Sequence, residues 1–161
     1  MKRNQTQYLA LGGMIAALYV VLTFVANAAG LASGEIQVRI SEGLCLLPCL
    51  FSAAVPGLTI GCLLANILTG CVPLDVAFGT LATLIGAVGT RMMRKTPFWS
   101  WIPPVLSNTI IVPLVLMKAY GVETAWPLLC FQIFAGEMIS CCLIGILVYQ
   151  GVKSIPRIAA D

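Results

Sequence analysis

Apolar residues dominate the chain in long runs separated by short polar stretches. Six of these runs are predicted as transmembrane helices, at residues 8–29, 43–54, 57–71, 76–91, 103–119 and 126–150. Crossing the hydrocarbon core of a bilayer takes about 20 apolar residues, with a range of about 17–25. The pattern therefore predicts an all-α membrane protein, a single domain over residues 1–161 that forms a six-transmembrane-helix bundle.

Residues 43–71 allow two interpretations. A single long helix here gives five spans, whereas a break at Pro56 and Gly57 gives six. Lys and Arg gather near span ends on the cytoplasmic side. With six spans only Arg39 and Lys118 fall outside, and the other basic residues all fall inside: Lys2, Arg3, Arg91, Arg94, Lys95, Lys153 and Arg157. We therefore predict six spans in the cell membrane, with both termini in the cytoplasm.

The two ends of the bundle are also marked by aromatic residues. Trp99 and Trp101 follow the basic run RMMRK, and Tyr120 and Trp126 bracket the short loop GVETA. Amphipathic rings anchor helices at the membrane interface. The first apolar run exceeds the about 7–15 residues of a signal-peptide core, so we expect the first helix to be retained.

Composition agrees with a membrane protein and excludes several functions. Hydrophobic residues make up 60% of the chain and charged residues 9%, against about 25% charged residues in soluble proteins. The net charge of +3 is too small to indicate a nucleic-acid partner. The chain has no histidine, and its seven cysteines form no C-x-x-C pair, so we expect no metal site and no cofactor. The cysteines are interpreted as small apolar packing residues.

Catalytic motifs are missing from the sequence as well. There is no Walker A loop, nucleophile elbow, H-E-x-x-H or dinucleotide fingerprint. We therefore do not expect an enzyme, and we do not expect this chain to hydrolyse ATP by the Walker A route.

Polar side chains inside the predicted spans are the first candidates for function. Glu137 is predicted about 16 Å from the outer end of the last helix, where an acidic group costs roughly 2.5–3.5 kcal/mol. It either bonds to a neighbouring helix in protonated form or contacts a ligand in a cavity, and the second interpretation is favoured. Asn66 and Asn108 either join helices through their amides or contact the ligand, with the structural role favoured for Asn108. Gln132 falls in the outer half of the last helix.

A crowded charged loop precedes the second predicted helix. The stretch GEIQVRISEG holds Glu35, Arg39 and Glu42, and its alternation of polar and apolar residues predicts a short extended segment. Ser41 is predicted as the N-cap of the second helix, with Glu42 in the first turn. A surface ion pair with Arg39 is the simpler alternative. We interpret the stretch as a lid whose residues Arg39 and Glu42 contact a ligand, whereas Glu35 is solvated.

The first helix carries a face of small residues. Gly12 and Ala16 are four residues apart, as are Gly13 and Ala17. Such spacing lets another helix approach closely. The face either packs within the bundle or docks onto a partner subunit.

Several segments together resemble one family. The stretches IQVRISEGLCLLPCLF, AVPGLTIGCLLANIL, LDVAFGTLATLIG, PPVLSNTIIV and GEMISCCLIG are similar to the queuosine-precursor transporter family (QueT). That family provides substrate-binding (S) components of energy-coupling factor (ECF) transporters. The resemblance implies six helices, docking through the first helix onto a membrane coupling (T) subunit, and two cytoplasmic ATPase subunits. The implied substrate is a 7-deazapurine, a 7-deazaguanine such as 7-aminomethyl-7-deazaguanine, or queuine.

The chemistry of that ligand assigns roles to the candidate residues. A guanine-like edge offers a ring N–H and an NH₂ group side by side, which a carboxylate accepts together, and we assign this role to Glu137. A cationic aminomethyl group would need a second carboxylate, from Glu42 or Asp75. The purine carbonyl would accept from Asn66 or Arg39. The expected stacking rings are Phe78, Phe131 or Trp126, and Gln132 completes the predicted substrate-binding set.

Four alternatives remain open at this stage. The chain could be an S component for another vitamin-like metabolite. It could be a stand-alone proton-coupled carrier with Glu137 as the proton site. A thiol-dependent membrane enzyme is disfavoured by the lack of C-x-x-C, and a purely structural subunit would leave Glu137 unexplained.

Overall fold

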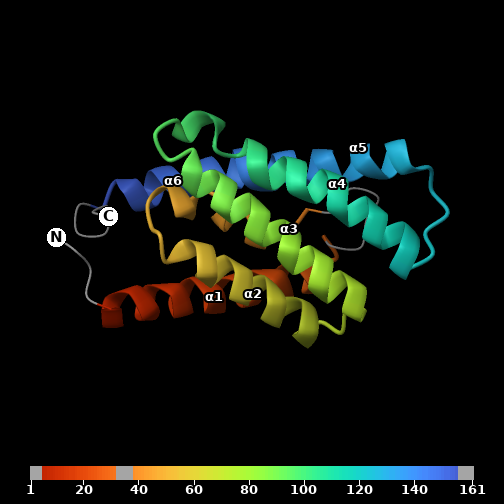
Figure 1. Cartoon of the computed structure of the whole chain (residues 1–161), viewed down its shortest axis with the longest axis horizontal. Helices are drawn as coiled ribbons and strands as arrows, with labels where there is room; N and C mark the ends of the chain where they lie inside the picture. The colour runs from red at the N-terminus through yellow and green to blue at the C-terminus, as the bar shows by residue number, and fades with distance from the viewer. Residues whose placement is uncertain (1–4, 32–37, 156–161) are drawn as a thin grey trace.

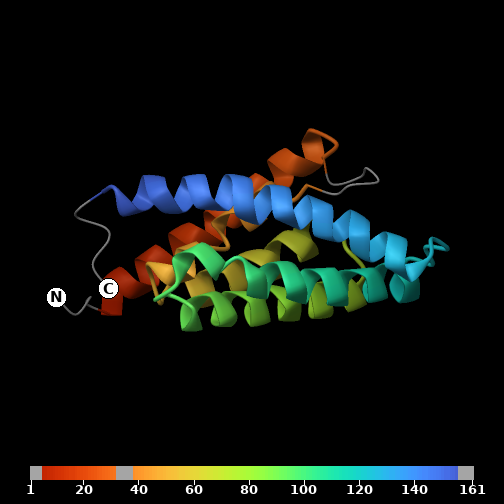
Figure 2. The same ribbon diagram turned by 90° about the horizontal axis from the view of Figure 1, so that it is seen from above.

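The computed structural model describes residues 5–31 and 38–155. Throughout these ranges the chain is helical or in turns and loops. Its α-helices run roughly along one long axis (Figure 1), and they are α1 (Gln5–Ala28), α2 (Ala54–Leu68), α3 (Pro73–Met92), α4 (Ile102–Ala119), α5 (Trp126–Glu137) and α6 (Gly145–Lys153). The start of α1 and the end of α6 lie at the same end of the bundle in both views (Figure 2).

Four helical rods are long and apolar enough to cross a membrane: Gln5–Ala28, Pro73–Met92, Pro97–Ala119 and Trp126–Lys153. The prediction of an all-α membrane protein is therefore confirmed. The last rod joins α5 to α6 through η4, a π-helical stretch at Met138–Ile144. By contrast, the 15 residues of α2 span only about 22 Å, less than the roughly 30 Å hydrocarbon core.

The prediction of an α-helix at residues 43–54 is wrong. The structure instead has two 3₁₀ turns, η1 (Ile40–Leu44) and η2 (Leu47–Cys49), followed by turns up to α2. Every residue from Ser41 to Pro48 is buried. Non-α backbone at membrane depth is tolerated where protein surrounds it. This interior segment, residues 40–49, packs between α1, η4 and α6.

The predicted break at Pro56 and Gly57 is also displaced. Both residues lie in the first turn of α2, where proline is tolerated because its missing N–H has no intrahelical partner in any case. The helix therefore begins earlier than predicted, at Ala54.

Small residues set the close approach of α1 and α2. A Cβ atom added to Gly57 would lie 2.8 Å from the Gly12 carbonyl oxygen, and one added to Gly61 would lie 3.0 Å from that of Ala16. Gly12 and Ala16 therefore pack inside the bundle, as one of the two interpretations predicted. Gly13 and Ala17 point away from α2 and are exposed.

Two buried apolar clusters hold the interior segment in place. The first joins Leu44 and Leu47 of the segment to Tyr19 of α1 and Leu58 of α2. The second joins Cys45 and Leu46 to Val105 of α4 and Cys141 of η4. All seven cysteines are free thiols, so non-covalent packing alone fixes the segment.

Candidate ligand-binding site

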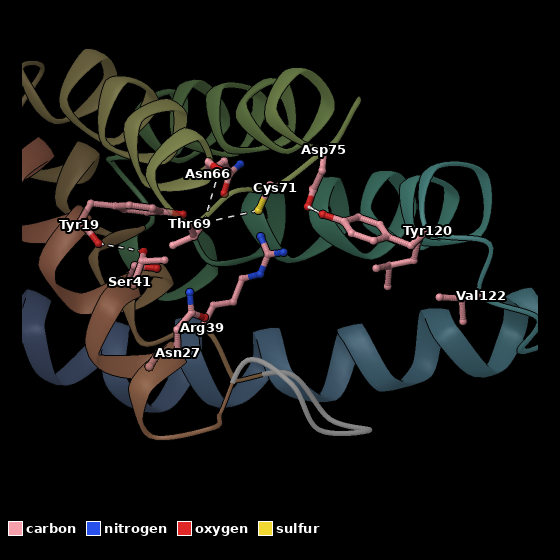
Figure 3. Close-up of a pocket in the computed structure, with 13 residues that line it drawn as sticks. Tyr19, Asn27, Arg39, Ser41, Asn66, Thr69, Cys71, Asp75, Tyr120 and Val122 are labelled. Carbon is pink, nitrogen blue, oxygen red and sulfur yellow. Dashed lines mark hydrogen bonds between the residues drawn. The ribbon is translucent and has the colours of Figure 1, made fainter. Parts of the chain in front are cut away.

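A cavity of about 320 Å³ opens at the end of the bundle where α1 and α4 finish and α3 begins. Its walls come from α1, Arg39 and the start of η1, α2, the start of α3 and the end of α4 (Figure 3). Small-molecule sites typically enclose roughly 300–1,000 Å³. The cavity therefore has room for one compact ligand.

Asp75 supplies a carboxylate to the cavity wall. It lies in the first turn of α3, and its Oδ2 atom accepts a hydrogen bond from the Tyr120 hydroxyl at 2.9 Å. The same hydroxyl accepts from the Val72 N–H at 3.4 Å. Burial and the hydrogen bond to Asp75 raise the pKa of Tyr120, so the phenol keeps its proton and remains a donor. The pair joins the end of α4 to the α2–α3 turn.

Asn66 places an amide beside Asp75. The side chain is 8% exposed and lines the cavity. Its Nδ2 atom lies 3.6 Å from the Cys62 Sγ atom, and no residue of the described ranges donates to its side-chain Oδ1 atom. A Cβ atom added to Gly79 would lie 3.1 Å from Asn66 Nδ2 and 3.3 Å from Asp75 Oδ1. The missing side chain at Gly79 therefore leaves space for both polar groups.

Arg39 brings a cation into the cavity from the opposite wall. Its side chain extends from the residues before η1 toward Cys71 and Asp75 (Figure 3). Burial opposes the charge, but the nearby carboxyl groups of Glu137 and Asp75 outweigh burial and raise the pKa of Arg39. The cavity thus presents a carboxylate, an amide and a guanidinium to one ligand.

Glu42 and Glu137 lie behind the cavity and are missing from its lining. They are only 2% and 3% exposed. Glu42 accepts a hydrogen bond from the Tyr19 hydroxyl at 2.5 Å. Glu137 accepts from Asn108 Nδ2 at 3.0 Å and from Cys141 Sγ at 3.4 Å. The Asn108 amide thus joins α4 to the α5–α6 rod, the structural role favoured for it from the sequence.

The two carboxyl groups approach each other in this buried region. One ligand-type atom from each of Glu42, Glu137 and Cys141 lies within 4.8 Å of the other two. Carboxylate and thiolate groups can bind metals, but here their hydrogen bonds go to Tyr19, Asn108 and one another. We therefore describe the trio as a polar core.

Other predicted site residues lie away from the cavity. Phe78 is 44% exposed on the outer side of α3, and Phe131 and Trp126 are also exposed on α5. Gln132 is half-buried on α5 and does not line the cavity. The aromatic rings that do line it, Tyr19 and Tyr120, were not predicted as ligand contacts.

The predicted lid runs across the boundary of the described residues. Glu35 and Ile36 lie outside the described residues. Ser41 is not an N-cap, because η1 begins at Ile40 with Arg39 in the cap position and no side-chain cap bond. Arg39 and Ser41 do line the cavity, whereas Glu42 turns into the polar core.

Four apolar rods long enough to cross a membrane, around a polar cavity that opens at one end, fit a membrane transporter for a small molecule. The chain belongs to the QueT transporter family, whose model matches residues 9–154. It is 34% identical over 104 residues to the queuosine precursor transporter QueT of Lactococcus lactis subsp. cremoris (strain MG1363). That match covers 62% of this chain and 61% of the relative, so the chain spans about three fifths of the relative's length. No solved structure matches the chain.

Proposed function

We propose that this chain captures a queuosine precursor, a 7-deazaguanine such as 7-aminomethyl-7-deazaguanine or queuine, for import by an ECF-type transporter. Membership of the QueT transporter family supports the proposal, as does the name of the Lactococcus relative. The observation that carries it is the convergence of Asp75, Asn66 and Arg39 in a cavity of about 320 Å³. These three groups complement the donors and the carbonyl of a guanine-like edge.

The lining of the cavity favours a different carboxylate for the proposed central contact. Asp75 lines the cavity, whereas Glu137 is engaged behind it. We therefore assign the ring N–H and NH₂ donors of the ligand to Asp75, with Arg39 donating to the ligand carbonyl. Asn66 binds at the same edge, and the rings of Tyr19 and Tyr120 wall the base. An aminomethyl cation would be attracted by Glu42 and Glu137 behind the cavity.

Calorimetry on the purified protein tests the ligand and its main contact. Binding of 7-aminomethyl-7-deazaguanine is compared with that of 7-deazaadenine, which lacks the paired donors of the guanine edge. Asp75→Asn should weaken binding of the guanine analogue by about 10- to 100-fold, because a charged hydrogen bond contributes about 1.5–3 kcal/mol.

Glu123→Gln is the matched control, since Glu123 is an exposed carboxylate in the loop between α4 and α5, next to the cavity-lining residue Val122. Equal effects of the two substitutions, or equal affinity for both bases, would contradict the assignment. Mass spectrometry of small molecules that co-purify with the protein gives an independent identification.

Coupling to a partner is the second part of the proposal. Gly12 and Ala16 contact α2, which leaves Gly13 and Ala17 as the exposed small-residue face for a membrane coupling subunit. Gly13→Leu and Ala17→Leu should abolish co-purification with the coupling and ATPase subunits but leave ligand binding intact. Ala77→Leu, at an exposed position on α3, is the control. Retention of the partners by both α1 variants would contradict this face.

The buried carboxyl pair favours one alternative, a stand-alone proton-coupled carrier. Proteoliposomes that contain this chain alone would then accumulate the ligand when a proton gradient is imposed. The ECF proposal instead expects accumulation only when the coupling and ATPase subunits and ATP are supplied. Uptake by the chain alone that depends on Glu137 would establish the carrier.

A further inference from the structure

A second cavity, of about 230 Å³, lies at the opposite end of α4 from the first. One wall is formed by Pro97 and Phe98 of η3 (Pro97–Trp99), and the other by α6. Leu46 of the interior segment is also part of the lining. None of these residues contributes to the candidate ligand-binding site.

The size and lining of this cavity indicate part of an amphiphile. Its volume is below the roughly 300–1,000 Å³ of ordinary small-molecule sites. Leu46, Phe98 and Ile146 make it largely apolar, and Gln150 and Lys153 place polar groups along α6. The Lys153 Nζ atom lies 5.7 Å from the centre of the Tyr149 ring, so the cation is held over an aromatic wall of the cavity.

The positive charge at this end of the bundle favours an anionic ligand for the second cavity. Arg91, Arg94 and Lys95 lie at the end of α3 and just beyond it, and Lys153 ends α6. The carboxylates of the described residues lie elsewhere: Asp75 begins α3, Glu123 follows α4, and Glu42 and Glu137 are in the polar core. Arg91 donates to the Pro48 carbonyl oxygen at 3.1 Å, whereas Lys153 lines the cavity.

The surroundings place the cavity beside lipid. Phe98 and Trp99 are exposed and pack edge to face, with ring centres 5.2 Å apart. Leu147, next to the cavity-lining residue Ile146 on α6, is exposed as well. Aromatic rings at a span end mark the membrane interface, which is where phospholipid phosphates are found.

We propose that this cavity binds an anionic phospholipid. The phosphate would contact the ammonium of Lys153 and the amide of Gln150, and the upper part of an acyl chain would lie against Phe98 and Leu46. Basic pockets between membrane helices bind anionic headgroups by this combination of charge and apolar contact. The proposal does not depend on the identity of the transported substrate.

Native mass spectrometry of protein released from nanodiscs tests the site. Phosphatidylglycerol adducts are counted against phosphatidylcholine adducts for the unmodified chain, Lys153→Gln and Lys153→Arg. Lys153→Gln should weaken phosphatidylglycerol binding by about fivefold, the equivalent of about 1 kcal/mol for one basic residue. Lys153→Arg should retain binding. Lys118→Gln is the control, because it removes an exposed cation at the other end of α4.

Several results would overturn the proposal. Equal losses of phosphatidylglycerol binding for Lys153→Gln and Lys118→Gln would mean that the lipid is attracted by diffuse surface charge. Equal adduct counts for the two lipids would mean that the cavity does not select anions. Soluble glycerol 3-phosphate that binds as tightly as phosphatidylglycerol would mean a free-anion site. Thermal unfolding in phosphatidylcholine checks that each variant is folded. If Lys153→Gln does not fold, the test is repeated with Gln150→Ala, at a second exposed lining position.

Discussion

Two groups of polar side chains lie one behind the other at the open end of the bundle. The cavity layer is Arg39, Asn66 and Asp75, which line the cavity. The buried layer is Glu42, Asn108 and Glu137, whose polar groups hydrogen-bond to other protein side chains. Both layers carry charge within an apolar chain, yet only the first faces open space. Charge at membrane depth therefore does not by itself identify a ligand contact, and the engagement of its hydrogen-bonding atoms must be known as well.

Removing a carboxylate from the buried layer should have the largest effect, and that effect should be on stability. Glu137→Ala leaves the Asn108 amide without its acceptor, removes one of the two acceptors of the Cys141 thiol and leaves a void behind the cavity. We expect a loss of about 2–4 kcal/mol in the free energy of unfolding, measured by chemical unfolding in detergent. Glu123→Ala should change it little. If Glu137→Ala kept full stability but abolished ligand binding, Glu137 would belong to the cavity layer.

Neutralising the cation of the cavity layer should affect binding more than folding. Arg39→Gln removes the proposed donor to the ligand carbonyl, and we expect affinity to fall by about 10- to 100-fold. Titration calorimetry gives the affinity, and the unfolding midpoint should stay close to that of the unmodified chain. A large drop in the midpoint with unchanged affinity would place Arg39 in the buried layer.

A smaller effect is expected where a methyl group crowds the cavity layer. Gly79→Ala would press on Asn66 Nδ2 and Asp75 Oδ1, at 3.1 and 3.3 Å from the new Cβ atom. We expect roughly a threefold loss of affinity, because the crowding should cost a free energy on the order of half that of one neutral hydrogen bond. Stability should be unchanged or slightly higher, because alanine is favoured over glycine within a helix. Gly151→Ala, with nothing within 4 Å of its Cβ position, controls for helix propensity, and equal affinities for the two variants would contradict the crowding.

The smallest effect should come from the link between Asp75 and the end of α4. Tyr120→Phe removes the hydroxyl that donates to Asp75. The ligand then no longer has to displace this hydrogen bond when its own donors bind to the Asp75 carboxylate. We expect binding that is tighter by roughly twofold, because the exchanged hydrogen bond contributes little net free energy. Stopped-flow association and dissociation rates measure the change. Weaker binding would instead show that the Tyr120 hydroxyl contacts the ligand directly.

The long spans could be predicted from the sequence because their apolar runs match the thickness of a bilayer. Asn66, Asp75 and Arg39 could also be selected, since polar groups are rare and costly in such a chain. Phe78, predicted to stack on the ligand, does not line the cavity, and the reason is physical. Both the lipid-facing and the core-facing sides of a membrane helix are apolar, so the pattern does not reveal which side a ring occupies.

The interior segment shows a second limit. Residues 41–48 are buried on every side, so no alternation of polar and apolar positions distinguishes a 3₁₀ turn from an α-helix. The Ser41 N-cap prediction failed with it. Tyr19 was missed because a single phenol within an apolar run carries no charge that would have selected it, although its hydroxyl bonds to Glu42.

Cys71 gives the cavity a chemical reporter that needs no engineering. Of the seven free thiols, it alone lines the cavity, and its sulfur lies 3.5 Å from the Thr69 hydroxyl. A small membrane-impermeant alkylating reagent that enters the open cavity reaches this sulfur, whereas the Cys45, Cys62 and Cys141 thiols are buried. Cys49, Cys130 and Cys142 are half-buried, so the modification is quantified on the peptide that contains Cys71. The rate of alkylation at Cys71 therefore measures cavity occupancy in intact cells, and it also records the side of the membrane to which the cavity opens.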